Sequence, residues 1–300
     1  MAAHRGGRRK WQRLDPPARE ADRRSARRVA ASVAHEFIEK GASAVVLGGS
    51  WARGDAHRES DIDLWVFGLR PGNIVLWRDP FMVTVDRRSE AGERRRLRTP
   101  PYVGGSVPGW RVAIALHDPE GVYRRLHTEA RRFRWESIGS KCDRWVAAQV
   151  VGWAEEAVKL VRALATGNDA TAAVQRDLLA DHLGFVMAVH RRMFWDSENE
   201  SWERISRAVG GDWARAQRRA LGVPAARLEE SCRGALALYA LTARAVEATL
   251  AEEQRAIVSH TLGVIGEPRH SLPRGSAIPG GRAGRWRPVR AGRTRALRRR

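Results

Sequence analysis

Two carboxylates separated by a single residue begin an apolar run in the first quarter of the chain. Asp61 and Asp63 flank Ile62, and Leu-Trp-Val-Phe follows. Because side chains alternate across an extended strand, both carboxylates project from the same face. Such a pair is costly when it is buried without a partner. It suits a hard divalent cation that prefers oxygen ligands and also binds substrate phosphates. The spacing therefore predicts a Mg²⁺ site.

A glycine turn precedes this pair, with ten residues between them. Gly48, Gly49 and Ser50 follow the apolar segment 44–47. The glycines allow close backbone approach, and the turn adds free N–H groups and a hydroxyl, which are the groups that hold a triphosphate. Arg53 would add a positive charge. A glycine pair alone is usually a turn, and an Asp-x-Asp alone is usually solvated. Their combination predicts a nucleotide site with ATP or another nucleoside triphosphate as co-substrate.

Apolar periodicity predicts the elements that position these residues. We expect a helix over residues 18–39 and strands over 44–47, 62–67, 81–85 and 110–116. A charged stretch, 87–98, and a glycine-rich stretch, 102–109, separate the last two strands. Asp118 and Pro119 then mark a helix start, with a capping acid followed by proline at the first helical position.

Helical periodicity dominates from Gly121 to about Ile265. Two apolar stripes stand out: Trp145, Val146, Val150, Trp153, Ala157 and Leu160 form the first, and Leu178, Leu179, Leu183, Val186 and Val189 form the second. Stripes of this kind are nearly always core, so they predict a helical bundle rather than a cofactor site. The fold class is therefore α+β, with a sheet-containing domain followed by an α-helical bundle domain.

The net charge of +20 is concentrated at the two ends of the chain. Residues 1–28 carry +7, residues 267–300 carry +10, and the segment between them carries +3. We interpret the ends as a solvated basic arm and a disordered basic tail, although non-specific attraction to phosphates stays open. A specific nucleic-acid partner is not expected, because the sequence between the ends lacks a strong basic groove signature.

Composition also argues against several classes of protein. Cys142 and Cys232 have no zinc-site spacing, so we expect reduced, packed thiols. The arginine-rich start has no apolar stretch that would serve as a signal peptide. The longest apolar helix candidate, 235–250, is interrupted by Arg244 and Glu247, so no membrane span is expected. These features predict a cytoplasmic protein.

The glycine turn and the carboxylate pair together resemble the nucleotidyltransferase superfamily that includes DNA polymerase beta and the kanamycin and lincosamide nucleotidyltransferases. The matching positions are Gly49, Ser50, Gly54, Ser60, Asp61, Ile62 and Asp63. The resemblance is specific over residues 44–67, and the helical segment that follows agrees with the layout of the antibiotic-modifying members. It implies a mixed sheet flanked by helices, and two metal ions at Asp61 and Asp63. It also implies in-line attack of an acceptor hydroxyl on the α-phosphate, with pyrophosphate leaving.

The family usually adds a third carboxylate from a later strand, which activates the acceptor hydroxyl or completes a metal site. Asp86, at the end of Met-Val-Thr-Val-Asp, is the favoured candidate, and an ion pair with Arg87 or Arg88 is the alternative reading of the same residue. Asp118 is the rival, although helix capping already explains it. The expected strand 110–116 carries no acid, which departs from some antibiotic-modifying members.

Other positions carry weaker signals. His117, His182 and His190 would line an acceptor cleft or serve structural roles. The run 196–202, with Trp195 before it, predicts either an acidic, aromatic cleft edge suited to a cationic sugar or a capped interhelical loop.

The expected organisation is an arm over 1–28, a catalytic domain over 29–118, a helical substrate domain over 119–266 and a tail over 267–300. The expected function is Mg²⁺-dependent transfer of a nucleoside monophosphate to a hydroxyl of a small molecule, such as an aminoglycoside-like or lincosamide-like antibiotic, as in antibiotic resistance. Two alternatives stay open. One is a protein or nucleic-acid nucleotidyltransferase, such as an antitoxin, and the other is a nucleotide-binding regulatory protein without turnover.

Overall fold

The computed structural model describes residues 18–266. The expected tail over 267–300 and the first seventeen residues of the expected arm lie outside this range. The first helix, α1 (Glu20–Glu39), runs without a break through residue 28. Its buried residues, among them Ala26, Ala30, Val33 and Phe37, recur at helical spacing and give the helix one apolar face.

A five-stranded mixed sheet forms the centre of the N-terminal half. Its strands are β1 (Ala44–Leu47), β2 (Ile62–Phe67), β3 (Gly72–Arg78), β4 (Phe81–Arg87) and β5 (Ile114–His117), in the spatial order β3-β4-β2-β1-β5. β2 and β4 are parallel, and the other neighbouring strands are antiparallel. The mixed sheet and the helical half confirm the α+β fold class.

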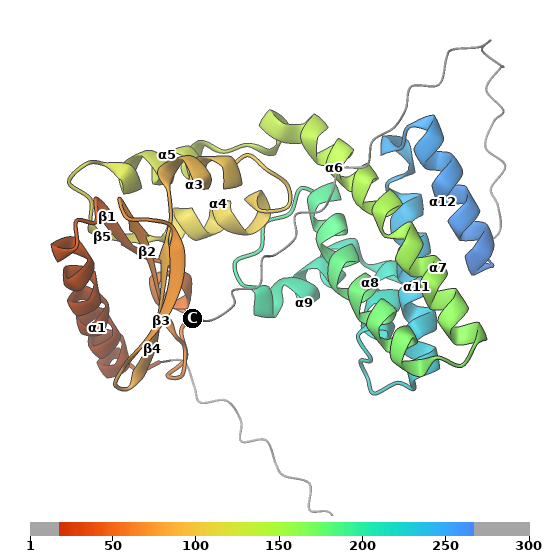
Figure 1. Ribbon diagram of the computed structural model, residues 1–300, viewed down its shortest axis with the longest axis horizontal. Coiled ribbons are helices and arrows are strands. Elements are labelled where there is room, and N and C mark those ends of the chain that lie inside the picture. The colour runs from red at the N-terminus through yellow and green to blue at the C-terminus, as the bar shows by residue number, and fades with distance from the viewer. Residues whose placement is uncertain (1–17, 267–300) are drawn as a thin grey trace, which may run out of the picture. The chain divides into compact units, whose positions relative to one another are not determined.

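Helices cover both faces of the sheet (Figure 1). Ile62, Leu64 and Val66 are fully buried on the face that packs against α1, because alternate residues of β2 point to that side. On the opposite face, Phe67 and Trp65 contact Trp110 of α4 (Val103–Val112). α3 (Glu90–Arg96) and α5 (Val122–Arg132) complete this second layer. The carboxylates at positions 61 and 63 belong to the face of α4.

Two local predictions were wrong. Residues 103–112, expected as a glycine-rich loop and the start of a strand, form α4 despite three glycines and Pro108. Tertiary packing outweighs propensity here, since Val103, Val107 and Trp110 lie one helical turn apart and are fully buried. β3 was not predicted, because this edge strand is largely exposed and has no apolar alternation.

The C-terminal half is helical, as expected. After the short 3-10 turn η1 (Trp135–Ile138), its helices are α6 (Gly139–Gly152), α7 (Ala154–Ala165), α8 (Asp169–His190), α9 (Glu198–Val209), α10 (Gly211–Ala220), α11 (Leu228–Ala245) and α12 (Glu252–Ile265), with a second 3-10 turn, η2 (Glu247–Thr249). The predicted stripes are core, since Val146, Val150, Leu179 and Leu183 are fully buried. No helix in residues 18–266 has the length and apolar character needed to cross a bilayer.

Candidate active site

The parallel pairing of β2 with β4 brings the carboxylate pair together with a threonine. Asp63 lies opposite Thr84 in the register. The Thr84 hydroxyl donates a hydrogen bond to Asp61 Oδ2 at 2.9 Å. The orientation of Asp61 is thereby fixed from the neighbouring strand, and the two half-buried carboxylates interact electrostatically.

The glycine turn packs directly onto these carboxylates. Gly49 has a φ of +60°, and a Cβ built there would overlap the Asp63 carboxylate. A Cβ at Gly48 would lie 2.6 Å from the Trp65 ring. The Gly48 N–H donates to the Asp63 carbonyl at 2.9 Å, which ties the turn to the start of β2. Only glycine fits this conformation and this spacing. Ser50 follows in the first turn of the short helix α2 (Gly49–Arg53).

Asp63 has an unusual protonation equilibrium. Burial and, after it, the charge of Asp61 raise its pKa from 3.8 to about 6, while Arg88 and Arg53 act in the opposite direction. Asp86 also raises this pKa, so its charge acts on Asp63. Two close carboxylates and a shifted pKa are typical of a site that a cation or a substrate proton completes.

Asp86 lies opposite Trp65 in the register, two residue pairs beyond Asp63 and Thr84 and on the same face of the sheet. It accepts a hydrogen bond from Arg88 Nε at 2.7 Å, which is the ion pair that the sequence offered as its alternative reading. The rival, Asp118, accepts from the N–H groups of Tyr123 and Arg124 and so caps α5. Because His117 pairs with Val45, Asp118 lies at the end of the sheet away from the glycine turn.

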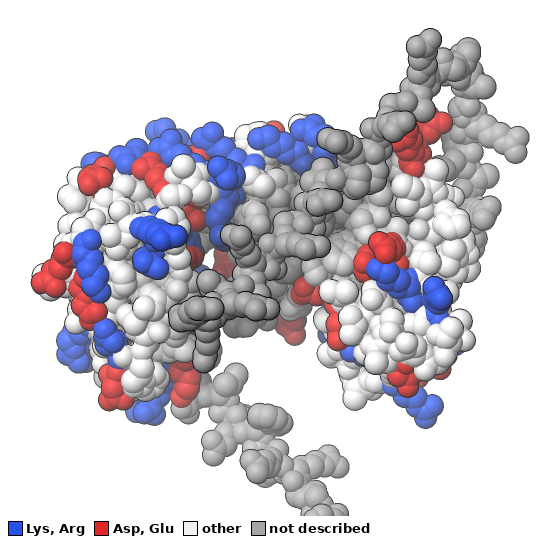
Figure 2. Space-filling view, in the orientation of Figure 1, with Lys and Arg blue, Asp and Glu red and all other residues white. Residues whose placement is uncertain are grey.

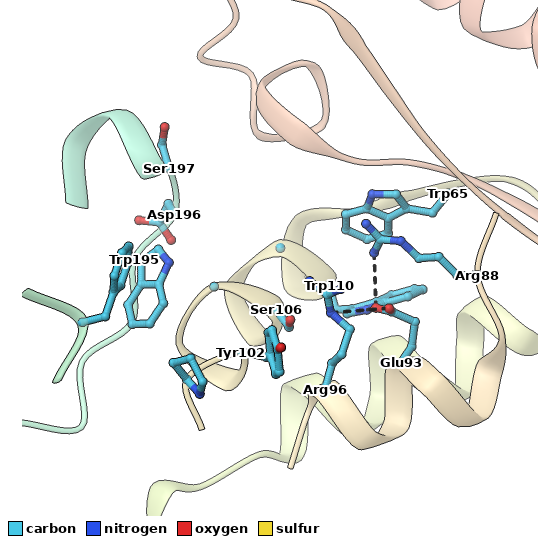
Figure 3. Close-up of a pocket in the computed structure, with 14 residues that line it drawn as sticks. Trp65, Arg88, Glu93, Arg96, Tyr102, Ser106, Trp110, Trp195, Asp196 and Ser197 are labelled. Carbon is cyan, nitrogen blue, oxygen red and sulfur yellow. Dashed lines mark hydrogen bonds and ion pairs between the residues drawn. The ribbon is translucent and has the colours of Figure 1, made fainter. Parts of the chain in front are cut away.

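A pocket of about 320 Å³ adjoins this site (Figure 3). Trp65 and Arg88 form its side nearest the carboxylates, and the Arg88 guanidinium stacks on the Trp65 ring at 4.4 Å. Glu93 is only 3% exposed and accepts hydrogen bonds from Trp110 Nε1 at 2.9 Å and Arg88 Nη1 at 3.2 Å. A buried carboxylate with two donors holds the arginine in place.

Trp195 and Asp196 line the other side of the pocket from the segment between α8 and α9, a position that fits both readings of this run. The Trp195 ring lies against Gly104 and Gly105 of α4, where a Cβ would overlap it, and the backbone N–H of Trp195 donates to the Gly104 carbonyl at 3.0 Å. The missing side chains of Gly104 and Gly105 therefore leave the space that the Trp195 ring fills. Sequence reasoning missed Glu93, Trp110 and Tyr102, and the charged stretch 87–98 was the only signal that pointed to part of this wall.

Comparison with known proteins identifies the N-terminal half. Residues 31–131 match the family model described as a nucleotidyltransferase domain. The chain contains a nucleotidyltransferase domain. A crystal structure of a nucleotidyltransferase-like protein from Exiguobacterium sibiricum is similar to it at 12% identity and a TM-score of 0.44, covering 78% of this chain and 77% of that one. No curated protein sequence matches the chain.

A divalent cation fits the donor set of the nucleotidyltransferase domain. Asp61 and Asp63 offer carboxylate oxygens, which suit Mg²⁺, and burial together with the charge of Asp61 raises the pKa of Asp63. Within residues 18–266 no group of three or more His, Cys, Asp or Glu side chains is arranged to hold a metal. Mg²⁺ bound with a nucleotide usually completes its coordination with phosphate oxygens and water.

The histidines lie outside the lining of this pocket. The His182 ring packs on Trp153 at 4.1 Å, and its Nδ1 lies 2.9 Å from the Leu178 carbonyl. His190 is half-buried, and burial lowers its pKa. His117 is part of β5. These contacts agree with the structural reading of the histidines.

Proposed function

We propose that the chain is a cytoplasmic, Mg²⁺-dependent nucleotidyltransferase that moves a nucleoside monophosphate from ATP or another nucleoside triphosphate to a hydroxyl of a small molecule. The observation that supports this most strongly is the contact of Gly49 with the carboxylate of Asp63, which joins the glycine turn and the Asp-x-Asp pair in one site. In the proposed organisation, residues 29–118 form the catalytic domain and residues 119–266 form the substrate domain.

The roles of the side chains follow from their positions. Asp61, oriented by Thr84, and Asp63 would hold the metal, which when bound supplies positive charge beside the α-phosphate. Gly48, Gly49 and Ser50 present backbone to the triphosphate. Arg53, which pairs with Asp55 at 3.0 Å, would turn to the phosphates.

The third carboxylate completes the reaction. The acceptor oxygen attacks the α-phosphorus, the bond to the bridging oxygen of the β-phosphate breaks, and pyrophosphate leaves. Asp86 accepts the proton of the acceptor hydroxyl, since it lies two residue pairs from Asp63 on the neighbouring strand and on the same face of the sheet. Arg88 Nε donates a hydrogen bond to Asp86 at 2.7 Å, which orients this carboxylate.

The pocket beside Trp65 is the proposed acceptor site. A volume of about 320 Å³ lies in the range of small-molecule sites rather than polymer grooves. Its aromatic walls would pack against the apolar faces of sugar rings, and Ser106 and Asp196 offer groups that hydrogen-bond to hydroxyls or amines. An aminoglycoside-like or lincosamide-like compound fits this chemistry, which would make the protein an antibiotic-resistance enzyme.

The test incubates the protein with Mg²⁺ and α-labelled nucleoside triphosphates and offers aminoglycosides, lincosamides, RNA and protein as acceptors. Label on a small molecule is expected, and Asp63→Asn should abolish it. Asp79→Asn is the matched control, because Asp79 is exposed in the turn between β3 and β4. Label on RNA or protein alone would overturn the small-molecule acceptor. Nucleotide binding without any transfer would favour a regulatory protein.

A further inference from the structure

A second hollow, of about 960 Å³, runs along α3, α5 and the start of α6. We propose that this basic groove binds the phosphate backbone of a nucleic acid. Its charged lining consists of Arg94, Arg98, Arg124, Arg125, Arg132, Arg134 and Lys141, with Glu129 as the single acid. The inference does not depend on the transfer reaction, because the acceptor pocket has a different lining.

The groove concentrates the charge of the described residues. Residues 18–266 contain 38 Lys and Arg and 32 Asp and Glu, a net charge of +6. The lining of the groove alone carries +6. All other described residues therefore balance to zero. Figure 2 shows Lys and Arg gathered along the upper edge, where Figure 1 places α3, α5 and the first turns of α6. The sequence between the two ends of the chain gives no strong signature of this groove, because net charge along a sequence does not report clustering in space.

Only part of this charge is neutralised. Glu90 and Glu129 pair with Arg94, Arg98 and Arg125 at distances of 2.6 to 2.9 Å. Within residues 18–266, the remaining lining cations, which are Arg124, Arg132, Arg134 and Lys141, form no ion pair with an acidic side chain. Clustered cations without partners create the positive potential that steers a polyanion to a surface.

The helix dipole explains only some of the basic residues that line the groove. Basic residues at the end of a helix are favoured by its dipole, which accounts for Arg94 and Arg132. Arg124 and Arg125, however, lie in the first turn of α5, and Lys141 lies in the first turn of α6. Cations at the start of a helix oppose the dipole. Arg125 is compensated by its ion pair with Glu90, whereas Arg124 and Lys141 have no such partner among the described residues, so an anion in the groove would offset their cost.

The chemistry of the lining favours nucleic acid over a lipid surface. Six of its seven cations are arginines, whose planar fork matches phosphate oxygens. The surface is hollowed, and none of the exposed large hydrophobic side chains among residues 18–266 lies in it. A membrane-binding face would present such side chains for insertion.

The test measures binding of the full chain to labelled single-stranded RNA, hairpin RNA and duplex DNA of matched length, by fluorescence anisotropy over a salt series. Arg124→Ala, Arg132→Ala and Lys141→Ala are combined in one variant. Arg24→Ala, Arg207→Ala and Arg218→Ala form the control variant, since these exposed arginines lie outside the groove. Both variants lose three charges and keep both ends of the chain. Circular dichroism and thermal unfolding verify that each is folded.

The groove variant should bind the preferred nucleic acid at least about tenfold more weakly, and the slope of log affinity against log salt should fall by about 3, one unit for each lost phosphate contact. The control variant should stay within about twofold of the wild type, because charges away from the phosphates are screened. Equal weakening of both variants would overturn the proposal. So would groove-dependent binding to vesicles of anionic lipid without binding to any of the three nucleic acids.

Discussion

The α-carbon of Gly49 faces the carboxylate of Asp63 across a gap too small for a methyl group. This relationship fixes the distance between the glycine turn and the carboxylate pair, because β2 and the turn are also joined by the Gly48 N–H. Any side chain at position 49 must push the turn away from Asp63.

We therefore predict that Gly49→Ala lowers kcat/KM for the nucleotide at least about 100-fold, since displacement of a site by about 1 Å costs that much. The left-handed backbone adds a stability cost of about 1–2 kcal/mol. Gly167→Ala is the control, because Gly167 has a φ of +65° with open space around it. Urea unfolding of both variants measures the cost of the left-handed backbone, which the two positions share. The kinetics of both variants measure the effect of the overlap with Asp63, which is specific to position 49. Equal kinetic effects of both substitutions would contradict the role of the Gly49 contact.

The raised pKa of Asp63 predicts that this carboxylate destabilises the folded state at neutral pH. Its folded pKa of about 6 exceeds its ordinary value of 3.8, so the folded state binds more protons between these values. The contribution of Asp63 to stability is therefore full below pH 3.8 and is lost as the pH rises through about 6. At pH 7, where Asp63 is ionised, the shift lowers the free energy of unfolding by up to about 3 kcal/mol.

Asp63→Asn should remove this deficit. The metal-free variant is expected to be more stable than the wild type in urea at pH 7, with the difference shrinking towards pH 4, while transfer is abolished. Mg²⁺ with nucleotide should stabilise only the wild type. A variant less stable than the wild type at both pH values would show that Asp63 is not destabilised by burial and its neighbouring carboxylate.

Trp195 provides a third prediction, which rests on the proposed acceptor pocket. It is 8% exposed and packs on α4, so Trp195→Ala should cost about 3–5 kcal/mol of stability. The KM for the acceptor should rise while the KM for the nucleotide changes little, because the ring lines the pocket and not the glycine turn. Trp77→Ala is the control, since Trp77 is 66% exposed on β3. An unchanged acceptor KM in a folded variant would show that Trp195 does not contact the acceptor.

The parts of the site that could be predicted from the sequence are local. β1 and β2 have the expected bounds because their apolar residues and the glycine turn lie within one short stretch. The pocket beside Trp65 could not be predicted as a whole, since it joins Trp65, Glu93 and Trp195 from three separate segments. α4 was missed for the same reason, because its glycines make sense only once Trp195 lies on them. Contacts between distant segments leave no periodic signal along the chain.

The choice between Asp86 and Asp118 as the third carboxylate provides the last prediction. Asp86→Asn should lower kcat by about 10² to 10⁴, the usual contribution of a general base, and leave the nucleotide KM nearly unchanged. Asp118→Asn should keep kcat within a few fold and cost less than about 1 kcal/mol of stability, because the asparagine side-chain oxygen still accepts from the N–H groups at the start of α5. Single-turnover rates at saturating nucleotide, with thermal unfolding alongside, measure both effects. The reverse pattern, with transfer lost in the position-118 variant and kept in the position-86 variant, would identify Asp118 as the proton acceptor. If both variants keep transfer, Asp86 is not the general base and its ion pair with Arg88 is purely structural.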